Sequence, residues 1–172
     1  MHDEAIFWNG VYERVLDNIY IIQKYLPEQI LFLQPYSSER VVHLAESPPS
    51  VNDPVRLLIS LTTDLSNVHF TCEIVGWDNK QLINGQKLEV LNKIIYSLQW
   101  PGEPGVYENI DNSQVKPLNL LYVRRMRKFN SPFSVEELKK SSSGESLSTE
   151  RTTSGGWTYI KNPDNVWLEK FL

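Results

Sequence analysis

The spacing of apolar residues near the N-terminus predicts a long helix over residues 3–26. Apolar side chains recur at steps of three or four from Phe7 to Leu26, and a second apolar row runs beside them from Trp8 to Tyr20. The apolar stripe is therefore broad, so we expect this helix to be well packed. Pro27 ends it, because proline is a strong stop signal for a helix.

The segments that follow predict short strands joined by turns, and then a second long helix. Residues 29–46 indicate two strands around a Pro-Tyr-Ser-Ser turn, and residues 55–63 indicate a buried strand. Residues 68–75 alternate in the way of a strand, and "DLSN" at 64–67 predicts the hairpin turn before it. Apolar residues at helical spacing predict the second helix over about 84–99.

The C-terminal third predicts a strand over 118–129, a short helix and a last strand over 156–161. The short helix follows Ser134 as N-cap, with Glu137 three residues later as in a capping box. This order predicts an α+β fold: a curved antiparallel β-barrel flanked by two long helices and a short third helix. The length suits one domain over residues 1–172, and the apolar ending "NVWLEKFL" leaves open that the chain is a piece of a longer protein.

Composition and charge favour a cytoplasmic protein whose cations lie in one region. The chain has one cysteine, an acidic N-terminus unlike a signal peptide, and no apolar run near the ~20 residues of a membrane span. Its net charge is −4, but the charges are unevenly distributed. Residues 1–115 hold 7 Lys/Arg and 15 Asp/Glu, whereas residues 116–161 hold 9 Lys/Arg and 4 Asp/Glu. Nucleic-acid binding would therefore need a local basic face on the C-terminal third.

Enzyme chemistry has little support, and we expect a non-enzymatic protein without metal or cofactor. The sequence contains no nucleotide-binding loop, dinucleotide fingerprint or nucleophile elbow, and its three histidines lack ligand spacing. Asp53 and Glu73 are spaced like part of a nuclease core, but Val75 stands where the lysine is needed. Cys72 and His69 would point to opposite faces of one strand, so we interpret Cys72 as a core residue.

Aromatic residues next to turns suggest a pocket for a flat ligand, such as a base taken out of its stack. An aromatic face can stack on that base while polar neighbours read its edge. The candidate pocket residues are Trp77, Tyr36, Ser37, Asp78, Trp157 and Trp100. For each aromatic residue, ordinary core packing is the alternative. It applies above all to Trp157, which follows Gly155-Gly156 and could fill the barrel.

The basic run "VRRMRK" at 123–128 is the candidate phosphate-binding element. In a regular strand, Arg125 and Arg127 would share one face, and Arg124 and Lys128 the other. Arg151 would add a further phosphate contact, as would Lys139, Lys140 and Lys161. Such contacts position a nucleic-acid strand without reading its sequence. The alternative is a solvated strand whose charges protect a sheet edge.

The order of several motifs resembles the PUA-like domains of the EVE/ASCH/YTH group. The motifs are "FWNGVYERVL", "LFLQPYS", "EIVGWDNK", "QWPGEPGVYE", "NLLYVRRM", "SPFSVEELKK" and "RTTSGGWTYI", which together span about residues 5–161. The chain looks closest to EVE-like modules associated with bacterial modification-dependent restriction nucleases. The resemblance implies a bent barrel that holds a flipped modified base, such as methylcytosine or methyladenine, between aromatic side chains. It places Trp77 as one wall of that cage.

The sequence therefore predicts a non-catalytic reader of a modified base, with modified DNA as its partner, in a restriction or defence system. Any nuclease activity would reside in a separate domain or subunit. The acidic N-terminal half departs from a typical DNA-binding face. The alternative is a protein–protein interaction module without a nucleotide pocket, in which the aromatic-rich N-terminal helix and the acidic half dock a partner chain.

Overall fold

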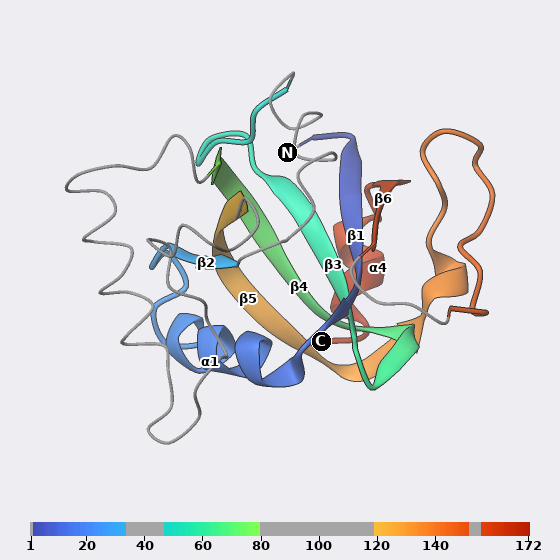
Figure 1. Cartoon of the computed structure of the whole chain (residues 1–172), viewed down its shortest axis with the longest axis horizontal. Helices are drawn as coiled ribbons and strands as arrows, with labels where there is room; N and C mark the ends of the chain where they lie inside the picture. The colour runs from blue at the N-terminus through green and yellow to red at the C-terminus, as the bar shows by residue number, and fades with distance from the viewer. Residues whose placement is uncertain (1, 34–46, 80–118, 152–155) are drawn as a thin grey trace, which may run out of the picture.

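The computed structural model describes residues 2–33, 47–79, 119–151 and 156–172, which build one six-stranded sheet (Figure 1). The strands lie in the order β2-β5-β4-β3-β1-β6. Their bounds are β1 (Glu4–Val11), β2 (Leu31–Leu33), β3 (Val55–Leu61), β4 (Asp64–Asn79), β5 (Asn119–Ser134) and β6 (Gly156–Lys161). The helices are α1 (Glu13–Gln23), the 3-10 turn η2 (Val135–Glu137) and α4 (Asn165–Glu169).

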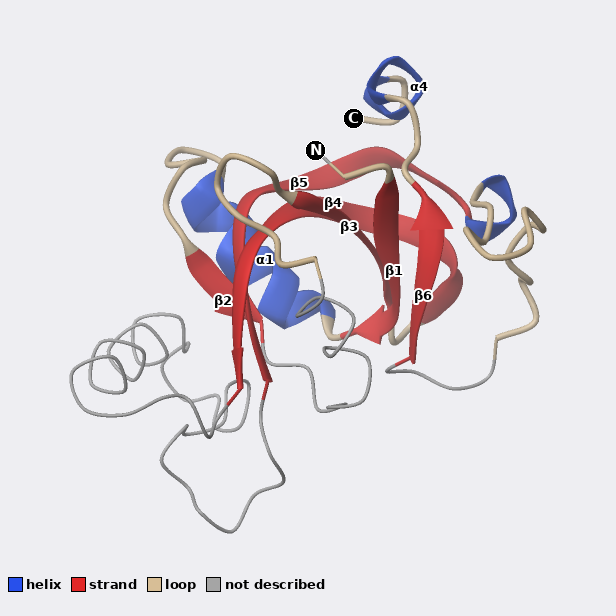
Figure 2. Ribbon diagram, turned by 90° about the horizontal axis from the view of Figure 1, so that it is seen from above, coloured by secondary structure: helices blue, strands red, loops and turns tan. Residues whose placement is uncertain are grey.

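The sheet is open and mixed, so the predicted closed antiparallel barrel between two long helices is wrong. Strand β1 pairs in parallel with β3, whereas the other pairings of the described strands are antiparallel. Figure 2 shows that the sheet curves without its edge strands β2 and β6 meeting. The helices α1 and α4 have 11 and 5 residues. The second predicted helix, over 84–99, lies outside the described residues.

The single long helix predicted over 3–26 is also wrong, because its first third is strand β1. Residues Ala5 to Asn9 are all buried, since β1 lies inside the sheet and is covered on both faces. A strand buried on both faces is continuously apolar, so it also satisfies a helical spacing. Gly10 has a positive φ of 78° near the end of β1, and its N–H donates to the Ser60 hydroxyl at 2.9 Å. The chain then turns into α1.

The two faces of the sheet carry two separate apolar clusters. On the concave face, Trp8, Ile59 and Phe70 pack with Leu16 and Ile19 of α1, and we call this cluster the concave core. On the convex face, residues of β1, β3 and β6 pack with η2 and α4 in the convex core, which includes Phe7, Leu58, Phe133, Leu138 and Leu168. Figure 2 shows α1 on the inner side of the curved sheet and α4 outside it.

The other strand predictions that fall on described residues are confirmed in position and differ mainly in length. Strand β4 begins at Asp64, so the hairpin turn is Thr62-Thr63 and the predicted turn residues 64–67 belong to the strand. Ser134 caps η2, and its hydroxyl accepts from the Glu136 N–H at 3.2 Å. Of the two strands predicted within 29–46, β2 is the described part. None of the helices among the described residues is long and apolar enough to cross a membrane.

Candidate functional site

Trp77 lies near the C-terminal end of β4, beside the first residues of β5 in the sheet. Its indole ring is partly buried and packs against the concave core, and its register partner on β5 is the buried Leu121. The preceding residue, Gly76, pairs with Tyr122. A Cβ atom on Gly76 would come within 3.3 Å of the Tyr122 Cδ2 atom, so the absent side chain lets the Tyr122 ring lie close to the strand.

A short hydrogen bond joins Tyr122 to Asp78 beside this tryptophan. The Tyr122 hydroxyl donates to Asp78 Oδ2 at 2.5 Å. Burial raises the pKa of Tyr122, and the neighbouring Asp78 carboxylate raises it further, so the hydroxyl stays a donor at neutral pH. Because successive residues of a strand point to opposite faces, Trp77 shares one face of the strand pair with Leu121, whereas Asp78 and Tyr122 lie on the other. Asp78 therefore braces the strand end and does not line the surface formed by Trp77.

Trp157 belongs to the concave core, so the alternative of ordinary core packing holds for this residue. It is 2% exposed and packs against Trp8, with the ring centroids 5.8 Å apart and the planes tilted by 59°. As placed, its faces are covered, so Trp157 shapes the concave core and does not stack on an incoming base. Trp8 was missed as a partner because its segment was predicted to be helical. The Trp8 Nε1 atom is buried and has no hydrogen-bond partner among the described residues.

The remaining pocket candidates, Tyr36, Ser37 and Trp100, lie outside the described residues. Of the six candidates, Trp77 is thus the aromatic residue whose described position suits stacking. It stands at a strand end with its ring incompletely covered, whereas Trp157 is enclosed.

Two arginines of the basic run are held by carboxylates from the acidic half of the chain. Arg124 is buried; its guanidinium donates to Glu73 at 2.7 Å, to Glu28 at 3.2 Å and to the Val51 carbonyl at 3.0 Å. Arg125 donates to the same carboxylates, to Glu28 at 2.6 Å and to Glu73 at 3.2 Å. These two side chains are therefore neutralised within the protein.

A bulge in β5 changes which cations share a face. Arg125 adopts a positive φ of 54°, its N–H donates to the Pro27 carbonyl at 2.9 Å, and the β4–β5 register shifts at this point. The extra residue of a bulge re-aims the side chains around it. Arg124 and Arg125 consequently meet the same two glutamates, and the predicted pairing of Arg125 with Arg127 on one face is wrong.

The other cations of the predicted phosphate site have different contacts. Arg127 pairs with Glu169 of α4 at 2.8 Å, whereas Lys128 reaches Asp17 at 3.2 Å and Glu13 at 3.4 Å on α1. The Arg151 guanidinium lies 4.9 Å from the centre of the Phe7 ring, and burial lowers its pKa. Arg127 and Lys128 can exchange these carboxylates for phosphate, since an exposed ion pair is worth about 1 kcal/mol or less.

Among the described residues, neither the metal-ligand types nor the Cys72–His69 candidates come together in a cluster. The described residues contain no cluster of three or more His, Cys, Asp or Glu side chains that could hold a metal ion. Cys72 is buried, and this burial raises the pKa of its thiol strongly. His69 hydrogen-bonds to Asp64 at 2.8 Å and not to Cys72, as their positions on opposite faces require.

The comparisons with known proteins leave the family open. The sequence matches no model of a protein family, no curated protein and no solved structure. The likeness to PUA-like domains accordingly stays a prediction that rests on the order of the motifs.

Proposed function

We propose that this chain is a non-catalytic nucleic-acid-binding module that recognises a modified base, with DNA as the favoured target. Its place would be the specificity part of a restriction or defence system, with nuclease activity in a separate domain or subunit. The observation that carries the proposal is the position of Trp77, an incompletely covered indole at the end of a central strand. The Gly76–Tyr122–Asp78 arrangement beside it supports the proposal, because it fixes the strand end that presents the ring.

Stacking on Trp77 supplies a suitable free energy for holding a single base. One base on an aromatic side chain gains about 1–3 kcal/mol, and unstacking a base costs a few kcal/mol, least for a damaged or unpaired one. Stacking alone thus roughly offsets extrusion. Discrimination must come from additional contacts to the modified group, and the base can make these contacts only while stacking holds it outside its helix. Removing the ring should therefore abolish selective binding and not merely weaken it.

The cations of β5 contribute less to phosphate binding in this proposal than their number suggests. Arg124 and Arg125 are held by Glu28 and Glu73, which leaves Arg127 and Lys128 as the exchangeable cations of the run. With two phosphate contacts on a single strand, the slope of log K against log salt should be about −1.4, whereas five contacts would give about −3.5. A titration in sodium chloride measures this slope.

The test compares Trp77→Ala with Tyr25→Ala. Tyr25 is 76% exposed near the end of α1, so its truncation removes an aromatic ring away from β4. Binding is measured by fluorescence anisotropy on matched oligonucleotides that carry cytosine, methylcytosine, hydroxymethylcytosine, adenine or methyladenine. We expect Trp77→Ala to lose the preference for one modified base and to keep residual backbone affinity, while Tyr25→Ala keeps the preference.

Equal binding of the unchanged protein to every member of the panel would sink the proposal. So would a modified-base preference that survives in Trp77→Ala, because the selective contact would then lie elsewhere. Both variants are compared with the parent by circular dichroism, so that a loss of binding can be separated from a loss of folding.

The protein-interaction alternative is supported by a different feature, an apolar patch around the C-terminal end of α1. Ile21, Tyr25, Leu26 and Ile30 are all exposed, with Tyr25 at 76% and Leu26 at 59%. Adjacent exposed apolar residues mark contact surfaces. A second copy of the chain is the partner that can be tested directly. Sedimentation should then show self-association that Leu26→Ser weakens, and a monomer at all concentrations would exclude it.

A further inference from the structure

The connection from α1 to β2 is held against the bulge of β5 by several hydrogen bonds. Gln23, at the end of α1, is 1% exposed. Its side chain accepts from the Met126 N–H at 2.8 Å and donates to the Val123 carbonyl at 2.9 Å. The Pro27 carbonyl accepts from the Arg125 N–H at 2.9 Å. These contacts satisfy backbone groups around the bulge, so they fix its shape.

Glu28, in the same connection, places its carboxylate between the two arginines of the bulge. One carboxylate oxygen accepts from Arg125 at 2.6 Å, and the other accepts from Arg124 at 3.2 Å. The hydrogen bond with Glu28 is the largest cause of the raised pKa of Arg125. The bulge thus carries two guanidinium groups against two carboxylates, those of Glu28 and Glu73, and its charges cancel.

The two carboxylates differ in how readily a competing anion can replace them. Glu73 is 16% exposed on the interior strand β4, whereas Glu28 is 57% exposed in a connection between elements. Without Glu28, the buried Arg124 would keep Glu73 and the Val51 carbonyl. Arg125 is 46% exposed and would share Glu73 with Arg124. Loss of the Glu28 charge would therefore leave one unbalanced positive charge, and the Arg125 guanidinium is its accessible part.

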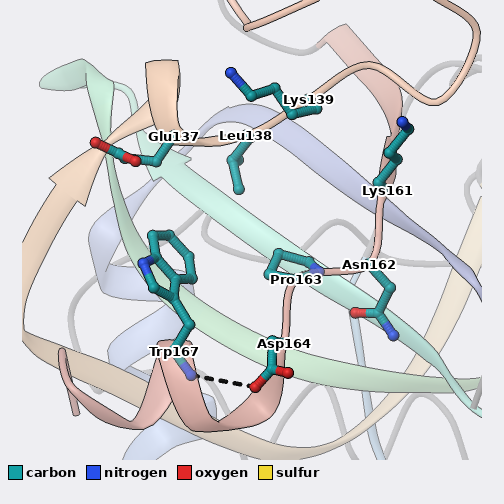
Figure 3. A pocket seen from close by; sticks show the side chains of 8 residues that line it. All are labelled: Glu137, Leu138, Lys139, Lys161, Asn162, Pro163, Asp164 and Trp167. Atoms are coloured by element: carbon teal, nitrogen blue, oxygen red, sulfur yellow. Dashed lines mark hydrogen bonds between the residues drawn. The ribbon is translucent and has the colours of Figure 1, made fainter. Parts of the chain in front are cut away.

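A pocket on the convex side also has balanced charges, but it lacks such a bridging carboxylate (Figure 3). The pocket has a volume of about 260 Å³ and lies between η2 and the connection from β6 to α4. Lys139 and Lys161 line it together with Glu137 and Asp164. The Asp164 carboxylate caps α4 and accepts from the Val166 N–H at 2.7 Å. This pocket therefore has no net charge that would select an anion.

We propose that Glu28 is an internal competitor for the phosphates of nucleic acid, which occupies the Arg124–Arg125 pair and lowers the affinity of β5 for polyanions. A carboxylate with one oxygen on each guanidinium takes the positions that two phosphate oxygens would take. The inference rests on the proposed function, since it concerns how the chain holds a nucleic-acid strand. Phosphate contacts are the same for every sequence, so masking these cations makes binding depend more on the recognised base.

The experiment measures how a single-stranded oligothymidylate, which carries no modified base, binds the parent chain and Glu28→Gln at increasing sodium chloride. Glu28→Gln keeps the size of the side chain and removes the competing charge. We expect its affinity at low salt to be about fivefold higher, the equivalent of one exposed charge pair. The slope of log K against log salt should change from about −1.4 to about −2.1, because one phosphate contact is added.

Two further variants separate the release of Arg125 from a general change in net charge. Glu136→Gln removes the same charge from an exposed residue of η2 and should leave the slope at the parent value. The double variant Glu28→Gln with Arg125→Gln has the net charge of the parent and should return both affinity and slope to the parent values.

Three results would overturn the masking role of Glu28. They are an unchanged affinity in Glu28→Gln, an equal gain in Glu136→Gln, and a gain that persists in the double variant. The proposed base recognition fails separately: a gain in Glu28→Gln without any base preference in the parent would exclude recognition at Trp77 and leave the masking intact. A base preference without that gain would exclude the masking alone.

Discussion

Glu73 holds the basic strand to the sheet, and its neutralisation should destabilise the fold. Its register partners are Arg56 on β3 and Arg124 on β5, so an arginine faces it from each side. The Glu73 carboxylate accepts from Arg124 at 2.7 Å and from Arg125 at 3.2 Å, and its charge acts on Arg56 as well. Glu73→Gln keeps the size of the side chain and leaves these arginines without their shared negative charge.

The expected cost follows from how deeply this ion pair is buried. The side chains of Arg124 and Glu73 are 9% and 16% exposed, and breaking a buried pair from one side costs about 3–5 kcal/mol. Arg124 keeps the Val51 carbonyl and the exposed Glu28, and glutamine keeps an acceptor oxygen. We therefore expect a loss of about 2–3 kcal/mol in the free energy of unfolding.

Glu169→Gln is the matched control, because it makes the same chemical change at the partner of another arginine on the same strand. Arg127 and Glu169 are 50% and 58% exposed, so their pair should contribute under about 1 kcal/mol. Urea unfolding measures both variants; with a slope of about 2 kcal/mol per molar, Glu73→Gln should lower the midpoint by about 1 M. Equal shifts in the two variants would refute the reasoning, because burial would then add nothing to the contribution of the Glu73 ion pair.

Three further predictions concern single positions. The Cys72 thiol is buried with a raised pKa, so a thiol reagent should label it only when the chain unfolds; rapid labelling of the native protein would contradict this. Gly76→Ala places a methyl group 3.3 Å from the Tyr122 ring and should cost about 1 kcal/mol in urea unfolding, whereas an unchanged midpoint would show that the ring moves freely. Burial acts to raise the pKa of Asp64, but hydrogen bonds such as that from His69 outweigh it and lower the pKa. This carboxylate stabilises the fold above its usual pKa of about 4, and the contribution disappears as the pH falls through the lower folded value. Unfolding curves of Asp64→Asn should consequently depend less steeply on pH below about 4 than those of the parent.

Local sequence patterns predicted the strands in which apolar and polar residues alternate and the strands whose ends carry turn residues such as glycine. The alternation around Phe70 and Cys72 identified β4, and Gly156 marks the start of β6. The same reasoning failed at β1, because Ala5 to Asn9 are buried on both faces and offer no alternation. The parallel pairing of β1 with β3 joins Ile6 to Leu57, a contact between distant segments that no short pattern encodes.

The candidate site could be predicted in its residue types and only partly in its geometry. The glycine beside Trp77 and its place at the end of a predicted strand identified it, whereas the burial of Trp157 depends on its packing against Trp8, 149 positions away in the sequence. The ion pairs of β5 were missed for the same reason, since Glu28 and Glu73 lie far from Arg124 along the chain. One signal for them was present: the acidic N-terminal part and the basic C-terminal third complement each other in charge.

This complementarity changes how a nucleic acid would be held. Cations that neutralise the protein's own carboxylates add little to its external field, so the basic run cannot by itself draw DNA to the sheet. Within the basic run, exchangeable positive charge remains on Arg127 and Lys128. Recognition would then depend mainly on stacking at Trp77, which salt does not screen. A reader of this kind needs few phosphate contacts, because its selectivity comes from the base that it encloses and its electrostatic attraction only brings the strand within reach.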